Sequence, residues 1–245
     1  MPRAASPLVR LLHMPRMPRL PRLPHQCEVC RQWSAQALCS DCVARFAAPQ
    51  PRCRCCGLHL GLAAAACGHC LRNKPPFQHT VCVAEYGFPW DHLIADFKFN
   101  GRAELAALLA HHLLNAVRAA ALPLPQLVLP VPLSAARLAE RGYNQAWELA
   151  RRVAAALKVP AEATLLQRPL DSAHQALLSR TERQRNLRTA FMADPRRRAQ
   201  LQGQRVALVD DVMTTGATAG EAATVLLRAG ASAVDIWVLA RTPQT

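Results

Sequence analysis

Eight of the ten cysteines in this 245-residue chain occur as four Cys-x2-Cys pairs. Two thiolates with this spacing lie on one tight turn and reach a single tetrahedral zinc, so two such turns complete a four-sulfur site. Four pairs therefore predict two zinc ions, which are structural because sulfur fills every ligand position. The predicted ligands are Cys27, Cys30, Cys39, Cys42, Cys53, Cys56, Cys67 and Cys70.

The order of the pairs along the chain favours two consecutive sites, with crossed pairing as the alternative. A disulfide framework is disfavoured because the chain shows no credible export signal and the spacing suits a metal better. His59 and His69 lie among the cysteines, but the sulfur count is complete without them. Because this region has few large apolar residues, we expect metal binding to supply much of its folding free energy.

The charge and hydropathy of the chain indicate a basic protein without a membrane span. The chain has 30 Lys and Arg against 16 Asp and Glu, a net charge of +14 that attracts polyanions without identifying one. The most apolar stretch, 103–120, is interrupted by charged and polar residues, so we expect no membrane span and a soluble protein. Residues 1–26 are rich in proline and arginine, lack acids, and are predicted to be a disordered basic tail.

After Pro75-Pro76 the pattern changes to short apolar runs alternating with helical periodicity. Such alternation predicts an α/β fold in which a parallel sheet is flanked by helices on both faces. We therefore divide the chain into a tail (1–26), a zinc module (27–75) and an α/β domain (76–245). The expected strands are 81–86, 127–132, 163–166, 206–209 and 233–239, and the expected helices are 91–99, 103–120, 143–157 and 217–228.

The strand expected at 206–209 leads into a turn that is suited to binding phosphate. In parallel sheets ligands bind beyond the carboxyl ends of the strands. There, backbone amides, hydroxyls and a helix dipole form an anion cradle, and two acids can accept hydrogen bonds from ribose hydroxyls or hold magnesium. The alternative is an ordinary strand–turn–helix junction with a threonine cap. The candidate residues are Val209, Asp210, Asp211, Thr214, Thr215, Gly216, Ala217 and Thr218.

A nucleoside triphosphatase can also place acids after an apolar strand, but it needs a phosphate loop with a glycine–lysine pair. None of the three lysines in the chain follows a glycine, which excludes that interpretation.

Residues 206–218 resemble the phosphoribosyl pyrophosphate signature of type I phosphoribosyltransferases. The order of motifs from Cys27 to Arg241 resembles the ComF family, which is associated with DNA uptake in natural transformation as a cytoplasmic helper. That family combines a double zinc ribbon with a phosphoribosyltransferase domain. The motifs are the four cysteine pairs, Phe97-Lys98-Phe99-Asn100-Gly101-Arg102, Val131-Pro132-Leu133 with Arg137, Arg141-Gly142-Tyr143-Asn144-Gln145, Gln175-x2-Leu178-Ser179-x3-Arg183-x2-Asn186, and 206–218.

The resemblance implies a role for each motif toward phosphoribosyl pyrophosphate and magnesium. Asp210 and Asp211 would meet the ribose hydroxyls, and residues 214–218 would wrap the 5-phosphate. Arg137 and Arg141 would neutralise the diphosphate. The implied pyrophosphate loop is Val131, Pro132, Leu133 and Ser134, and the implied mobile loop contains Gln175, Ser179, Arg183 and Asn186. In that loop Ser172 stands where the family often has threonine.

Three functions stay open at this point. The chain can be a phosphoribosyltransferase, a non-catalytic ribose-phosphate sensor that engages single-stranded DNA or a helicase partner, or a zinc-stabilised adaptor with a vestigial pocket. Retention of both acids and every turn hydroxyl argues against the adaptor. Aromatic residues make up only 5% of the chain, so binding of single-stranded DNA would rest mainly on charge. DNA-uptake proteins are the other expected partners, and the sequence identifies neither an acceptor base nor an oligomeric state.

Overall fold

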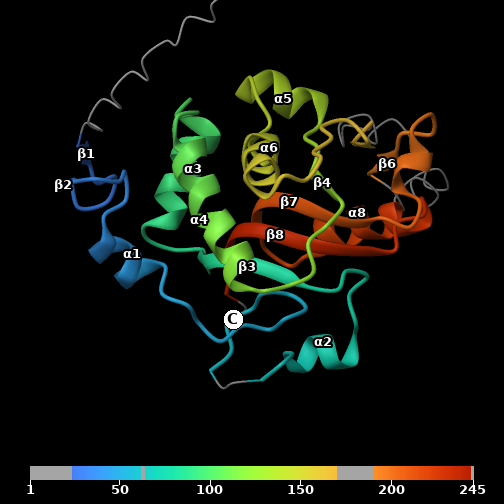
Figure 1. Ribbon diagram of the computed structural model, residues 1–245, viewed down its shortest axis with the longest axis horizontal. Helices are drawn as coiled ribbons and strands as arrows, with labels where there is room; N and C mark the ends of the chain where they lie inside the picture. Colours follow the sequence, from blue (N-terminus) through green and yellow to red (C-terminus); the bar gives the residue numbers. More distant parts are fainter. Residues whose placement is uncertain (1–23, 62–63, 170–189, 244–245) are drawn as a thin grey trace, which may run out of the picture. The chain divides into compact units, whose positions relative to one another are not determined.

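The computed structural model describes residues 24–61, 64–169 and 190–243 (Figure 1). The predicted basic tail therefore lies almost entirely outside the described residues. The chain forms two compact units, one that ends at Cys39 and one that begins at Ser40. Within the first unit, β1 (His25–Gln26) and β2 (Trp33–Ser34) pair antiparallel.

The second unit is built on a four-stranded parallel sheet with the strand order β3-β8-β7-β4. Its strands are buried on both faces, which is why they read as continuous apolar runs in the sequence. All nine residues of β8 are buried. The predicted α/β class and the parallel sheet are confirmed. The strands are β3 (Thr80–Glu85), β8 (Ala233–Arg241), β7 (Arg205–Met213) and β4 (Leu127–Pro130).

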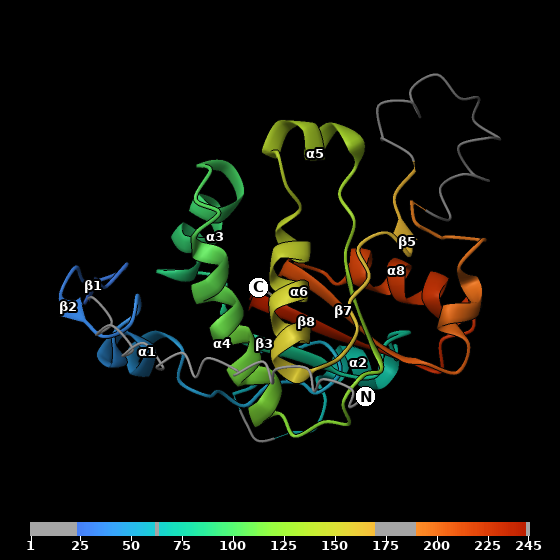
Figure 2. The ribbon, with the colours of Figure 1, turned by 45° about the horizontal axis from the view of Figure 1, so that its top comes forward.

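Helices cover both faces of this sheet. The chain steps from β3 to β4 through α3 (Trp90–Phe99) and α4 (Leu105–Ala119), and returns from β7 to β8 through α8 (Ala217–Arg228). Because crossovers of one hand in opposite directions place their helices on opposite faces, α8 lies across the sheet from α3 and α4. The helix α6 (Gln145–Leu157) packs beside α4 and contacts β4 and β7 (Figure 2).

The structure corrects two of the expected strand assignments. The run expected as a strand at 163–166 does not enter the main sheet. Instead β5 (Leu166–Gln167) pairs antiparallel with β6 (Met192–Ala193), and Ala161 forms a parallel bridge to Val128. The strand expected to end at Val209 continues to residue 213, so the acidic pair lies inside β7 rather than after it.

Four short helices were not expected from the sequence. The first contains the buried Cys42, the second and third are capped by Cys67 and Ser134, and the fourth is anchored by the buried Leu201. They are α1 (Ser40–Phe46), α2 (Gly68–Arg72), α5 (Ala135–Arg141) and the 3-10 helix η2 (Arg198–Leu201).

Candidate functional site

The turn between β7 and α8 has the features of an anion-binding helix terminus. Gly216 caps α8 with a φ of +84°, and it supplies no side-chain hydrogen bond to the first amides of the helix. A Cβ at this position would lie 2.6 Å from Cε of Met213, so only glycine fits without a shift of that side chain. Thr214, Thr215 and Thr218 are exposed around it. The Ala217 amide donates to Oγ1 of Thr215 at 3.3 Å. The exposed hydroxyls of this turn thus lie at a helix N-terminus, an arrangement that suits an anionic ligand.

The two acids occupy adjacent positions of β7, and successive side chains of a strand point to opposite faces. Asp211 is buried, and its Oδ1 lies 2.8 Å from Nζ of Lys98 on α3. Asp210 accepts a hydrogen bond from the backbone amide of Asp211 at 2.9 Å. Burial, followed by the charge of Asp211, raises the pKa of Asp210 to about 7, against the lowering effect of Lys98 and Arg141.

A cavity of about 40 Å³ adjoins this turn. Its wall includes Val131 from the loop after β4, together with Asp210, Thr214, Gly216 and Thr218. Of the two predicted acids, Asp210 thus shares a hollow with the predicted phosphate turn at the carboxyl edge of the sheet, whereas Asp211 pairs with Lys98 and does not line it.

The loop after β4, predicted to hold the pyrophosphate, lies at this same edge because β4 and β7 pair in parallel. The amide of Val131 donates to the carbonyl of Val209 at 2.8 Å, and Asn144 Nδ2 donates to the Val131 carbonyl at 3.1 Å. The loop continues through Pro132 and Leu133 to Ser134, whose hydroxyl accepts from an amide of α5 and so serves as a helix cap.

The two predicted arginines differ in their surroundings. Arg137 is exposed on α5. Arg141 donates to Oε1 of Gln145 at 3.1 Å, stacks over the Phe99 ring, and contributes to the field that acts on Asp210. Buried Nε of Arg141 and Nε2 of Gln145 have no hydrogen-bond partner among the described residues. Two unsatisfied buried donors near an acidic pair suit an anionic ligand.

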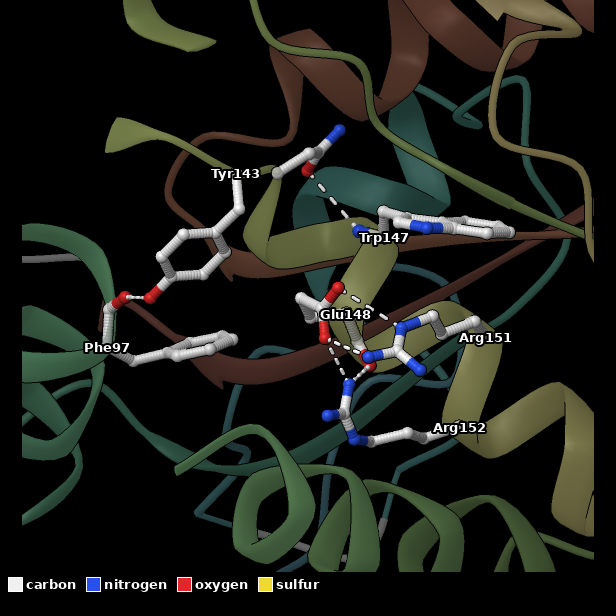
Figure 3. A network of polar contacts seen from close by, with 7 residues as sticks. Phe97, Tyr143, Trp147, Glu148, Arg151 and Arg152 are labelled. Carbon is white, nitrogen blue, oxygen red and sulfur yellow. Dashed lines mark hydrogen bonds and ion pairs between the residues drawn. The ribbon is translucent and has the colours of Figure 1, made fainter. Parts of the chain in front are cut away.

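The segment that follows α5 is fixed by polar contacts at the start of α6 (Figure 3). The Tyr143 hydroxyl donates to the carbonyl of Phe97, which ties this segment to α3, the helix that carries Lys98. Burial raises the pKa of Tyr143. Glu148 pairs with Arg151 and Arg152 (Figure 3), so these two charges are partly neutralised within the helix.

The predicted mobile loop lies outside the described residues, and so does Ser172. The loop residues concerned are Gln175, Ser179, Arg183 and Asn186. Sequence reasoning also missed one member of the site, Lys98. Lys98 is the lone lysine of the motif Phe97 to Arg102, and the fold brings it to 2.8 Å from Asp211 on β7.

The cysteines form two clusters of four, grouped consecutively as predicted. Within each cluster the four sulfur atoms lie within 4.8 Å of one another, a spacing that suits one tetrahedral zinc. The first cluster consists of Cys27, Cys30, Cys39 and Cys42. The second consists of Cys53, Cys56, Cys67 and Cys70.

Backbone amides stabilise thiolates in both clusters. Cys53 Sγ accepts from the amide of Cys67 at 3.2 Å. Burial raises the pKa of Cys53, but amide hydrogen bonds led by that of Cys56 outweigh it and lower the pKa to about 7. The same balance lowers the pKa of Cys27 to about 6, while burial raises that of Cys70. Each cluster thus holds one sulfur prepared to lose its proton to a metal.

In the part of the chain that the structure describes, no helix is both long and apolar enough to cross a bilayer. No protein-family model matches the chain. The chain is 38% identical over 223 residues to the DNA utilization protein YhgH of Salmonella typhi, covering 88% of this chain and 96% of that protein.

Two further relatives are named for competence. Competence protein F of Haemophilus influenzae is 36% identical, with 83% of this chain and 90% of that protein covered. Competence protein ComFC of Bacillus subtilis is 29% identical, with 70% and 68% covered. Among solved structures, the glutamine phosphoribosylpyrophosphate amidotransferase of B. subtilis matches 56% of this chain and 26% of its own at 23% identity, with a TM-score of 0.38.

Proposed function

Because the chain belongs to the ComF family of competence and DNA utilization proteins, we propose that its β7–α8 turn binds phosphoribosyl pyrophosphate together with magnesium. The observation that carries this proposal is the shared cavity of Asp210, Thr214, Gly216 and Thr218. The N-terminus of a helix attracts phosphate, and here its N-cap residue is a glycine that brings no side chain of its own. A neighbouring carboxylate can accept hydrogen bonds from ribose hydroxyls.

Each part of the ligand has a matching group in the site. The amides and hydroxyls of residues 214–218 would hold the 5-phosphate. Asp210 and Asp211 would orient the ribose, with Nζ of Lys98 lying 2.8 Å from Oδ1 of Asp211. The loop 131–134 and Arg141 would face the diphosphate, where the unpaired Nε of Arg141 offers a donor.

In the proposed reaction, the bond between the anomeric carbon and the pyrophosphate oxygen would break through an oxocarbenium-like state, and an acceptor base would form the new bond to that carbon in its place. A magnesium ion bound with the ligand would supply positive charge to the diphosphate. Arg141 adds a fixed cation on the same side, and the acids keep the ribose in the orientation for displacement. The predicted functional division is a metal module at 27–75 and a phosphoribosyltransferase-like domain at 76–245.

A ribose-phosphate sensor that acts on single-stranded DNA or on DNA-uptake proteins is the second candidate. It is favoured by the names of the relatives, which refer to DNA utilization and competence, and by the net charge of +14. Because that charge would dominate, DNA affinity of the sensor would fall steeply with salt. Assistance to DNA uptake in natural transformation is compatible with both candidates.

Calorimetric titration with phosphoribosyl pyrophosphate and magnesium tests the site. Wild type should bind, and the double variant Asp210→Asn with Asp211→Asn should lose most of the heat. Asp235→Asn is the matched control, since it removes a buried acid bonded to His79 and Arg205 at the opposite end of the sheet. Equal heats in wild type and the double variant would reject the site. Pyrophosphate release over a panel of bases then separates an enzyme from a sensor.

A further inference from the structure

Arg241 is a buried cation at the end of β8 that the function described so far does not use. Its side chain is among the largest that are fully buried, with 1% of the residue exposed. The guanidinium donates to the carbonyls of Cys56 at 2.9 Å, Met213 at 3.2 Å and Thr242 at 2.8 Å, and also to that of Thr214. Among the described residues, no carboxylate forms an ion pair with it.

These acceptors belong to two different sites. Met213 and Thr214 are the last residue of β7 and the first residue of the proposed phosphate turn. Cys56 is a member of the second cysteine cluster. One planar guanidinium therefore joins the backbone of a metal-binding loop to the backbone of the phosphate turn, and its rigid fork fixes their relative position.

The loop that carries Cys56 is itself pressed against the sheet. The amide of Gly57 donates to the carbonyl of Cys53 at 2.8 Å, which closes a tight turn between two of the ligands. The Thr80 hydroxyl on β3 donates to the carbonyl of Cys55 at 2.5 Å. A Cβ on Gly57 would lie 2.9 Å from Cγ2 of Thr80. The second cluster is thus packed as part of the sheet's own core.

We propose that Arg241 is a positioning residue for the phosphate turn, and that through it metal binding at the second cysteine cluster sets the geometry of that turn. The affinity part of this inference rests on the proposed function. A metal on Cys53 and Cys56 fixes the turn between them and hence the Cys56 carbonyl. Loss of the metal frees that acceptor, and the guanidinium then no longer holds the Thr214 carbonyl in place.

The buried charge adds a second effect at the same place. Among the described residues no carboxylate pairs with this guanidinium, which donates to the Thr214 carbonyl at the start of the phosphate turn. In a medium of low dielectric constant this field favours an anion at the turn. Removal of Arg241 should therefore weaken phosphate binding by loss of both order and charge.

The test compares Arg241→Met and Arg241→Lys with Arg205→Met. Arg205 lies at the opposite end of the sheet, where it bonds Gln78 and Asp235, so its variant controls for loss of a partly buried arginine. Amide hydrogen exchange without ligand reports on residues 214–218, calorimetry gives the affinity for phosphoribosyl pyrophosphate with magnesium, and metal analysis gives zinc content.

Arg241→Met should speed exchange across 214–218 and lower the affinity, each about tenfold or more relative to Arg205→Met, since a charged hydrogen bond is worth at least that factor. Arg241→Met and Arg205→Met should each retain two zinc ions per chain. Arg241→Lys should recover part of the loss, because it restores the charge but not the fork. If Arg241→Met matches Arg205→Met in exchange and affinity, the inference fails.

Metal removal at one cluster completes the test. Cys70→Ala, which disrupts the second cluster, should weaken binding in the wild-type background but have little further effect beside Arg241→Met. Cys30→Ala in the first cluster should leave exchange at 214–218 unchanged. Equal effects of Cys70→Ala in both backgrounds would overturn the coupling. If wild type binds no phosphoribosyl pyrophosphate while the exchange differences persist, the proposed ligand is rejected and the positioning role stands.

Discussion

Replacing Gly216 by alanine probes the backbone on which the proposed phosphate site depends. The residue has a φ of +84°, a left-handed conformation that costs an L side chain about 1–2 kcal/mol. The new Cβ would also approach Cε of Met213 to 2.6 Å. Met213 is buried, so its displacement adds about 1–3 kcal/mol of overpacking. We expect Gly216→Ala to lower the free energy of unfolding by about 2–5 kcal/mol.

Gly203 offers a matched control for this substitution. It has a φ of +69° but nothing within 4 Å of an added Cβ, and it lies before β7, at the far end of the strand. Gly203→Ala should therefore lower the free energy of unfolding by only about 1–2 kcal/mol in urea, and it should leave ligand affinity unchanged. Calorimetry should show weaker binding of phosphoribosyl pyrophosphate for Gly216→Ala alone. If the two variants bind equally well, the close approach at Gly216 has no part in ligand binding.

Three further predictions concern charge and metal. Because burial raises the folded pKa of Asp210 to about 7, this carboxyl group destabilises the protein increasingly as pH rises from its ordinary pKa toward 7. Asp210→Asn should therefore stabilise the protein more at pH 8 than at pH 5, with a difference of at most about 3 kcal/mol in urea unfolding; an advantage independent of pH would contradict this. Lys98→Met should lower the free energy of unfolding by about 1–3 kcal/mol in the same assay, because it leaves Asp211 unpaired. Adding Asp211→Asn to this variant should recover much of that free energy. Additive losses in the double variant would refute the pairing. Removal of zinc by a chelator should lower the melting temperature of the sheet by more than about 6 °C, because the second cluster shares its core, and an unchanged melting curve would show that cluster to be dispensable.

The sequence predicts the parts of this fold whose signals are local. Cysteine spacing is sufficient for both clusters, and the apolar runs of β3, β7 and β8 predict the parallel sheet because buried strands show no alternation. Helix α8 has the predicted bounds, since Gly216 and Gly230 flank it. The acids were expected after the strand because charged residues are rarely buried, yet pairing with β8 extends β7 through them.

The parts that sequence reasoning missed depend on contacts between distant segments. Lys98 reaches Asp211 across more than a hundred residues, and Arg241 meets Cys56 across 185. Neither pairing has a periodicity or a spacing that a linear pattern can show. The clue was a cation, Arg241, at the end of a predominantly apolar strand, because a buried charge must find partners. Similarly, the run at 163–166 has strand composition, but its pairing with β6 is decided by tertiary structure.

Amide chemical shifts test the central claim most directly. In a titration of 15N-labelled protein with phosphoribosyl pyrophosphate and magnesium, the largest changes should occur at the amides of 214–218 and at Asp211, with smaller changes in the loop 131–134. Ribose 5-phosphate should perturb the turn but not that loop. Saturating ligand that leaves the turn amides unmoved, or perturbs only a distant surface, would contradict the account.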